Sequence, residues 1–333
     1  MANLTLDVFW INFMPIYQHV IGAVTAMLTI IVIYLMITKT PESGKPLARY
    51  LIFMQLSILL ADFCWGFLVA PVFLFPLTAA LCTGIICSTE SSRHVGAVLL
   101  FQFNIQVALM VTYTLHFKYM TIVRMTNHRE ITIIEKVVIR LFFWIVLELP
   151  VSCMVIAGVS QQELHQFLLD EKQFTLANMI ATNSDLRGMA YYIPRFLWIP
   201  ITLAALVVMA MVVVVTGCVY FVGKTLIMLS TKTAAMSDRT RNMQRGLVRT
   251  LVMQLTVPLV IQIVPIFIAV GAMTTMWGSP GSMNFMLCVM LCHASFHTVF
   301  LIMTTPSYRA AVMCTTTQRK ETMINSKASL VKI

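Results

Sequence analysis

The sequence has little formal charge and lacks the residue patterns that catalysis and metal binding need. Charged side chains make up 11% of the 333 residues, whereas about 25% is usual for a soluble domain. No GxSxG, HExxH, paired-aspartate protease pattern or phosphate-binding glycine loop occurs. The 8 cysteines form no zinc or haem spacing. We therefore expect no enzymatic activity, no cofactor and no metal centre.

Three further classes of protein are excluded or disfavoured. The net charge of +10 does not indicate a nucleic-acid partner, because the bases lie between apolar segments and no polar domain carries a binding face. The last apolar run, 283–303, contains no lysine, which excludes a retinal Schiff base there. No internal repeat is evident, which weakens the interpretation as a transporter built from inverted halves.

Hydrophobic residues make up 59% of the chain and gather in long runs. About 20 apolar residues in a helix cross the hydrocarbon core of a membrane. Seven such runs occur, near residues 16–37, 51–72, 95–117, 141–159, 196–222, 250–272 and 283–303. They predict an all-α, integral membrane bundle of seven transmembrane helices, preceded by residues 1–15 and followed by a tail at 304–333.

The distribution of positive charge predicts the orientation of this bundle. Loops rich in Lys and Arg stay on the cytoplasmic side of a membrane. With the N-terminus outside, only Arg93, Lys172, Arg187 and Arg195 among the 23 Lys and Arg residues face the extracellular side. We therefore expect an extracellular N-terminus and a cytoplasmic C-terminus.

The sixth run follows the densest basic cluster and contains two prolines. Arg241, Arg245 and Arg249 precede or meet an uncharged stretch of 23 residues, 250–272. Pro258 within it removes a backbone hydrogen bond and favours a kink, which membrane helices tolerate. A kinked helix with a basic cytoplasmic end is a candidate moving part.

Polar side chains inside apolar runs are costly and therefore invite functional hypotheses. Asp62 could hold an ion or water and order a polar network, or it could be a plain interior hydrogen-bond acceptor. Glu148 precedes Pro150, which favours a local structural role. His293 and His297 have the i, i+4 spacing of a metal-binding pair, but without a third ligand we favour packing or hydrogen bonding, with Asp62 a candidate partner.

A group of amides and aromatic side chains near the outer half of the bundle forms the candidate ligand pocket. An equally weighted alternative is that the amides bond neighbouring helices and the rings form interfacial belts. The candidate ligand-binding residues are Gln102, Asn104, Gln106, Trp198, Gln262 and Phe267.

Four residues at three sites are candidates for covalent modification. Only Cys82 and Cys87 are expected to face an oxidising compartment, so a disulfide between them is an option, although free thiols are favoured. Asn3 begins a glycosylation sequon, which has meaning only if the N-terminus is extracellular. Cys314 near the cytoplasmic face could be palmitoylated or be an idle thiol.

Five stretches carry a family resemblance. They are PIYQHVIGAV at 15–24, RYLIFMQLSILLADF at 49–63, VAPVFLFPL at 69–77, TRNMQRGLVRTLVMQLTVP at 240–258 and TTPSYR at 304–309. In this order and relative to seven spans, the chain resembles the nematode serpentine chemoreceptors of the Str superfamily, most closely classes H and I. These are seven-helix G-protein-coupled receptors.

The sequence departs from the wider rhodopsin-like pattern at three places. The third span ends without an Asp-Arg-Tyr triplet, so the resemblance assigns the G-protein contact there to Lys118 and Tyr119. The fourth loop has no cysteine, so the usual bridge from the third span to that loop cannot form. Thr29 stands where an asparagine partner for Asp62 would be expected.

We therefore expect a chemosensory G-protein-coupled receptor of the plasma membrane, and the resemblance implies the sensory cilium of a chemosensory neuron. Its expected partners are a small-molecule or peptide cue, a heterotrimeric G protein and the lipid bilayer. The alternatives are a seven-span transporter, a ligand-gated channel, or a receptor that no longer signals. The residues expected to carry switching and G-protein coupling are Asp62, Lys118, Tyr119, Arg241, Arg245, Arg249, Gln254, Pro258, His297, Tyr308 and Arg309.

Overall fold

The computed structural model describes residues 8–73, 79–127, 132–157, 189–191, 198–230 and 280–313, together with parts of 244–271. Several sequence predictions concern residues outside this described part. They are Asn3, the side chain of Trp198, Arg241, Arg249, Gln254, Pro258, Gln262 and Cys314.

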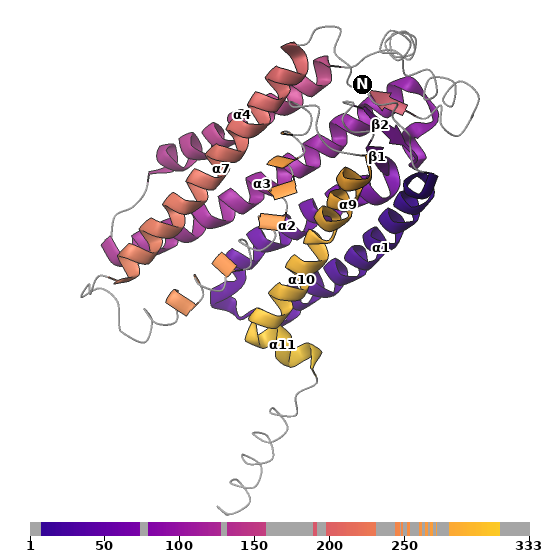
Figure 1. The fold of residues 1–333 in the computed structure, drawn as a ribbon. Helices are drawn as coiled ribbons and strands as arrows, with labels where there is room; N and C mark the ends of the chain where they lie inside the picture. Colours follow the sequence, from indigo (N-terminus) through magenta and orange to yellow (C-terminus); the bar gives the residue numbers. More distant parts are fainter. Residues whose placement is uncertain are drawn as a thin grey trace, which may run out of the picture.

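The described part of the chain is mostly helical, as predicted, and contains 6 helical segments long and apolar enough to cross a membrane. The sixth predicted run, 250–272, is described only in short pieces. The helices run side by side in one bundle (Figure 1). They are α1 (Val8–Lys39), α2 (Lys45–Phe63) with its π-helical continuation η2 (Cys64–Leu68), α3 (Glu90–Asn127), α4 (Ile133–Ile156), α7 (Trp198–Ser230), and the pair α9 (Pro280–Leu291) and α10 (His293–Thr304).

Short helices connect or follow these segments. The 3-10 turn η1 (Glu42–Gly44) joins α1 to α2, and η3 (Ile85–Ser88) precedes α3. The helix α11 (Pro306–Val312) follows α10 at the end of the bundle opposite the small sheet (Figure 1).

The helices extend beyond the apolar runs into positions that we predicted to be loop. Lys118 and Arg124 lie on α3, and Lys136 and Arg140 lie on α4. A local signal explains the early start of α4, because Thr132 and Glu135 form a reciprocal capping box. Hydropathy identifies only the part of a helix that lies in hydrocarbon, so the polar ends were missed.

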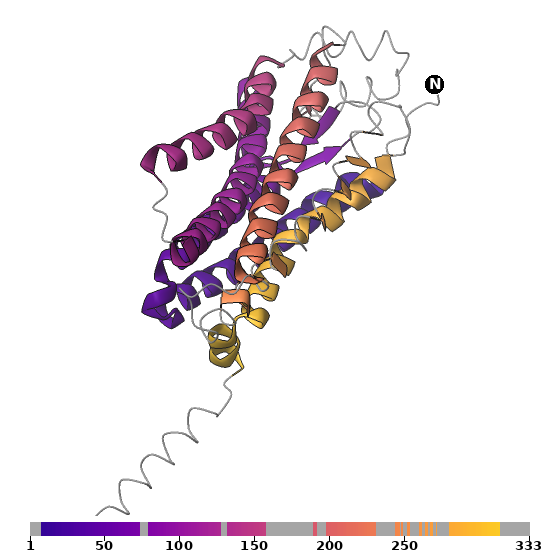
Figure 2. The same cartoon turned by 90° about the vertical axis from the view of Figure 1, so that its left-hand side faces the viewer.

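A three-stranded antiparallel sheet, which the sequence did not predict, lies at one end of the bundle (Figure 2). Its strands are β1 (Pro71–Phe73), β2 (Ala79–Cys82) and β3 (Met189–Tyr191), in the order β1-β2-β3. Val72 pairs with Leu81, and Ala80 pairs with Ala190. The strand β3 belongs to the long connection between α4 and α7, which is thereby joined to the segment before α3.

Side-chain amides from two helices bond the outer edge of β1. Alternate residues of an edge strand point their N–H and C=O groups away from the neighbouring strand. Gln18 of α1 donates from Nε2 to the Pro71 carbonyl at 2.8 Å. Asn284 of α9 accepts from the Phe73 N–H at 3.2 Å and donates to the Phe73 carbonyl at 3.0 Å. The sheet is therefore attached to both α1 and α9.

A close backbone contact packs α1 against η2 beneath the sheet. A Cβ atom added at Gly66 would lie 3.0 Å from the Gln18 carbonyl oxygen and 3.4 Å from the Gly22 Cα. Small residues of this kind let membrane helices approach closely. The π-helical turn also buries Trp65 against the apolar cluster around the sheet.

Candidate functional site

A buried polar cluster joins α1, α2 and α10 in the middle of the bundle. Gln55 donates from Nε2 to Nδ1 of His297 at 3.0 Å. The Thr298 hydroxyl donates to Oε1 of Gln55 at 3.4 Å. Thr25 of α1 and Ser295 of α10 are bonded through their hydroxyls at 2.8 Å. These bonds link three helices that are distant in sequence.

Asp62 lies in this cluster with unusual surroundings. It is buried, and neither of its carboxylate oxygens has a hydrogen-bond partner among the described residues. The Thr29 hydroxyl and Nε2 of His297 are also buried there without a partner in that part of the chain. A bare ionised carboxylate in such surroundings would be costly, so the geometry fits a protonated acid, or one that binds water or a cation.

The structure gives His297 a different partner from the one we suggested. Its ring bonds Gln55 rather than Asp62. Gln55 was missed in the sequence, although a signal was present: it is a polar residue inside an apolar run, seven positions before Asp62. That spacing places the two side chains on one face of α2.

The three candidate amides of α3 do not converge. Gln102 donates from Nε2 to Oε1 of Glu148 on α4 at 2.8 Å. Asn104 donates to the Leu100 carbonyl of its own helix at 2.6 Å. Residues two apart on a helix point to different sides, so Gln106 shares a face with Gln102 and not with Asn104. Glu148 thus receives a bond from a neighbouring helix, beyond the local role that we favoured.

Among the aromatic candidates for ligand binding, the structure describes only the side chain of Phe267, which is 45% exposed. The ligand-binding role of this ring and of the α3 amides stays a prediction.

Lys118 joins α3 to the segment that precedes the sixth run. Its side chain is 6% exposed, and Nζ donates to Oε1 of Gln244 at 2.6 Å. Tyr119 is half-buried and packs against Phe221 of α7, with ring centroids 5.7 Å apart. Arg245, next to Gln244, is exposed. Lys118 is therefore engaged inside the bundle in this arrangement, whereas Arg245 is open to a partner.

Tyr308 and Arg309 lie on α11 below the bundle. The Tyr308 side chain is buried, and its hydroxyl is 2.7 Å from that of Thr40, which follows α1. Burial raises the pKa of the Tyr308 phenol, so this hydroxyl stays protonated at neutral pH. Arg309 is exposed. Tyr308 thus fastens α11 to the end of α1 and leaves Arg309 at the surface.

A cluster around Arg140 was not found from the sequence. Arg140 donates from Nη2 to the Tyr50 hydroxyl at 2.7 Å, and its guanidinium carbon lies 5.7 Å from the ring centroids of both Tyr50 and Tyr113. The Tyr113 hydroxyl also donates to the Arg140 carbonyl at 2.8 Å. Such pairings depend on how α2, α3 and α4 are rotated relative to one another, and no single apolar run in the sequence reveals that rotation.

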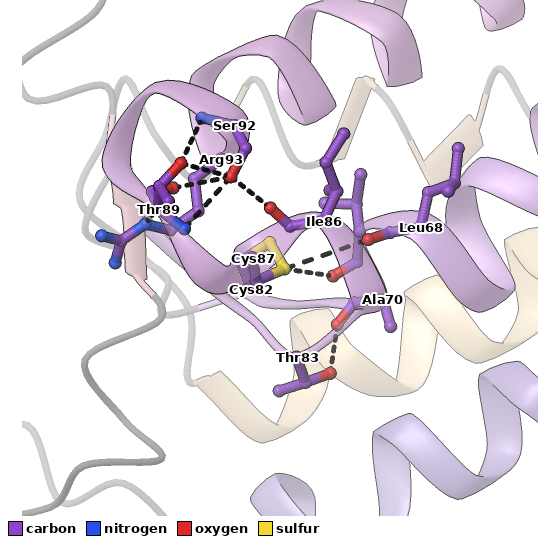
Figure 3. Close-up of a disulfide and its surroundings, with 10 residues drawn as sticks. Leu68, Ala70, Cys82, Thr83, Ile86, Cys87, Thr89, Ser92 and Arg93 are labelled. Atoms are coloured by element: carbon purple, nitrogen blue, oxygen red, sulfur yellow. Dashed lines mark hydrogen bonds between the residues drawn. A yellow bond between two sulfur atoms is a disulfide. The ribbon is translucent and has the colours of Figure 1, made fainter.

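A disulfide joins Cys82 and Cys87 beside the sheet (Figure 3). We had favoured free thiols, which the structure contradicts. The bridge connects the end of β2 to η3, directly before α3. Thr83 donates from its hydroxyl to the Ala70 carbonyl at 2.6 Å and holds the same turn. Because β3 pairs with β2, strand pairing attaches the long α4–α7 connection to the start of α3, without a cysteine in that connection.

Removing this disulfide is expected to loosen the sheet. Cys82→Ser opens a loop with a sequence separation of 5, and loop-closure entropy gives a loss of about 2 kcal/mol for so short a loop. We expect a lower thermal unfolding temperature of the purified protein. Cys153→Ser, which removes a thiol that is free in the structure, is the control. Equal unfolding temperatures for Cys82→Ser and wild type would contradict the prediction.

Comparison with known proteins identifies the family. The model of the family described as "Serpentine type 7TM GPCR chemoreceptor Sri" matches residues 5–312. The crystal structure of squid rhodopsin is similar in fold, with a TM-score of 0.59 and 14% sequence identity over 95% of this chain and 90% of that chain. No curated protein matches. The bundle is thus a seven-transmembrane receptor fold, and the chain belongs to the Sri family of serpentine G-protein-coupled chemoreceptors.

Proposed function

We propose that this protein is a plasma-membrane receptor that binds an external small-molecule or peptide cue and activates a heterotrimeric G protein. The bond between Lys118 and Gln244 is the observation that carries the proposal, because it joins α3 to the segment that must move if the sixth helix is to swing outward. Family membership supports the chemosensory role. Residence in the sensory cilium remains part of this proposal.

The position of the disulfide supports the proposed orientation. Disulfides persist in oxidising compartments and are rare in the cytosol. The end of the bundle that carries Cys82 and Cys87 therefore suits the extracellular side. The opposite end, with α11, Lys118 and Arg245, then faces the cytosol, in agreement with the distribution of bases along the chain.

The receptor works by shifting the populations of two helix arrangements. A ligand shifts such an equilibrium only by its difference in affinity for the two states. In this arrangement, the Lys118–Gln244 hydrogen bond holds the cytoplasmic end of α3 to the segment that precedes the sixth run. Movement of the sixth helix, with Pro258 as its pivot, breaks this bond and opens a basic crevice for the carboxyl-terminal helix of a Gα subunit.

The polar cluster around Asp62 is the second part of the proposed switch. Gln55 and His297 connect α2 to α10, and the polar atoms of Asp62, Thr29 and His297 that lack a partner among the described residues leave room for a different set of hydrogen bonds in another arrangement. Because α11 follows α10, a change in this cluster also moves Tyr308 and Arg309 at the cytoplasmic end.

To test this function, the receptor is expressed in reporter cells, and the cells are exposed to a panel of volatile and soluble cues. The readout is dissociation of the G protein. A cue that dissociates the G protein only in receptor-expressing cells supports the proposal. Cue-dependent current or substrate flux in cells without G proteins would instead establish a channel or a transporter.

Charge reversal at the proposed crevice is expected to abolish signalling. Arg245→Glu combined with Arg249→Glu replaces the basic rim of the proposed crevice with acids. A partner surface that complements a basic rim is acidic, and like charges facing each other across an interface cost several kcal/mol. We expect G-protein dissociation to fall to background while cell-surface expression persists. Lys45→Glu, at an exposed base of α2, is the control. Normal signalling by the double variant would refute the contact.

A further inference from the structure

The seventh span is broken at Cys292. The N–H of Cys292 donates to the Val289 carbonyl, three residues back, at 3.2 Å. A regular α-helix would direct this N–H to the Cys288 carbonyl, four residues back. Cys292 has φ −71° and ψ −14° and separates α9 from α10. Because of the break, the Cys288 carbonyl does not receive the hydrogen bond that the Cys292 N–H would donate in a regular helix.

Tyr17 of α1 supplies the missing donor. Its hydroxyl donates to the Cys288 carbonyl at 2.8 Å. The same hydroxyl lies 3.0 Å from Sγ of Cys292. Since the hydroxyl hydrogen goes to the carbonyl, the thiol donates to the hydroxyl oxygen. One side chain of α1 thus contacts both the last turn of α9 and the residue at the break.

A second carbonyl near the break also has a side-chain partner. Nδ1 of His293 lies 2.8 Å from the Met290 carbonyl, and a carbonyl only accepts, so Nδ1 carries the proton. Carbonyls at the end of a helix inside a membrane must be satisfied within the protein. The bonds from Tyr17, Cys292 and His293 reach three consecutive carbonyls, those of Cys288, Val289 and Met290.

The two halves of the seventh span have different partners. Above the break, Asn284 of α9 is bonded to Phe73 of β1. Below the break, His297 of α10 is bonded to Gln55 of α2. The helix α1 lies beside both halves (Figures 1 and 2). The break consequently separates a part joined to the outer sheet from a part joined to the buried polar cluster.

We infer that Tyr17 is a positioning residue whose hydroxyl keeps the seventh span broken at Cys292, so that α9 and α10 move as separate segments. Without the hydroxyl, the nearest donor to the Cys288 carbonyl is the Cys292 N–H. Their bond would join α9 and α10 into one continuous helix and turn His297 relative to Gln55. The consequence for signalling rests on the proposed function, whereas the consequence for the backbone does not.

The first experiment measures the backbone. Hydrogen exchange by mass spectrometry is followed over 285–300 in the purified full-length receptor, with Tyr17→Phe as the variant. We expect exchange about threefold slower than in wild type, because a continuous helix opens less often. Tyr34→Phe, which removes an exposed tyrosine hydroxyl from the same helix, is expected to change nothing. Wild-type exchange in Tyr17→Phe would overturn the inference.

A second variant distinguishes loss of the break from a general folding defect in Tyr17→Phe. Proline at 292 has no N–H and its ring excludes the carbonyl four residues back, so it enforces the break, and its φ of about −65° suits this position. We expect Cys292→Pro, added to Tyr17→Phe, to raise exchange to the wild-type rate or above it, because proline also removes the N–H that bonds the Val289 carbonyl. Exchange that stays slower than wild type in the double variant would show that Tyr17 acts by another route, and the inference would fail.

A measurement of signalling distinguishes failure of this inference from failure of the proposed function. In reporter cells, Tyr17→Phe is expected to change basal G-protein activation by about threefold, and Cys292→Pro in the same chain is expected to reverse that change. Slowed exchange with unchanged basal activation would exclude the break from the switch. Failure of the wild-type receptor to activate any G protein would refute the proposed function, while the exchange experiment would still decide the role of Tyr17.

Discussion

Lys118→Met is expected to raise basal G-protein activation about tenfold, because it removes the bond to Gln244 that holds α3 against the sixth segment. A hydrogen bond from a charged group contributes about 1.5–3 kcal/mol, and each 1.4 kcal/mol or so is a factor of ten in an equilibrium. Lys118 is 6% exposed, so solvent does not replace the lost bond. The measurement is cue-independent G-protein dissociation at matched surface expression.

Two variants control this result. Lys224→Met removes an exposed lysine of α7 and is expected to leave basal activation unchanged. Gln244→Glu gives Lys118 an anionic acceptor and is expected to lower basal activation. If Lys118→Met lowers basal activation or leaves it at the wild-type value, the bond does not restrain the receptor.

Gly84→Ala is expected to reduce surface expression several-fold. A Cβ at Gly84 would lie 2.2 Å from the Leu68 carbonyl oxygen and 2.7 Å from the Val69 nitrogen, both of which are backbone atoms. The N–H of Gly84 also donates to the Val69 carbonyl at 3.0 Å, so the two segments cannot separate without losing that bond. Overpacking of this kind costs about 3 kcal/mol or more, enough to change cellular abundance.

The matched control is Gly223→Ala, because a Cβ at Gly223 meets nothing within 4 Å. Alanine is a better helix former than glycine by roughly 1 kcal/mol, so this variant is expected to be expressed at least as well as wild type. Surface labelling of intact cells compares the two. Equal labelling of Gly84→Ala and Gly223→Ala would show that the turn before α3 can relax.

The sequence was most informative where the membrane restricts the chain most strongly. Hydrocarbon demands long apolar helices, so the runs at 16–37 and 51–72 correspond to α1 and to α2 with η2. The sheet escaped prediction because β1 has three residues, two of which lie inside the apolar run 51–72, so these two read as the end of a span. A strand this short carries no alternation to detect.

The partners of the polar side chains were less predictable than the helices. Asp62 and His297 were both singled out, but the choice of Gln55 over Asp62 as the partner of His297 depends on the rotation of α2 against α10. Gln102 likewise bonds Glu148 on a neighbouring helix. Rotation and depth are set by packing over whole helices, and one sequence contains no direct record of them.

The amides of Gln18 and Asn284 at the edge of β1 have a consequence for recognition. A peptide can bind a receptor by adding a strand to an exposed sheet edge, where unpaired backbone groups act as a template. Here Pro71 and Phe73 already have side-chain partners. A peptide cue, or a second receptor molecule, would have to displace both amides before it could extend the sheet at β1.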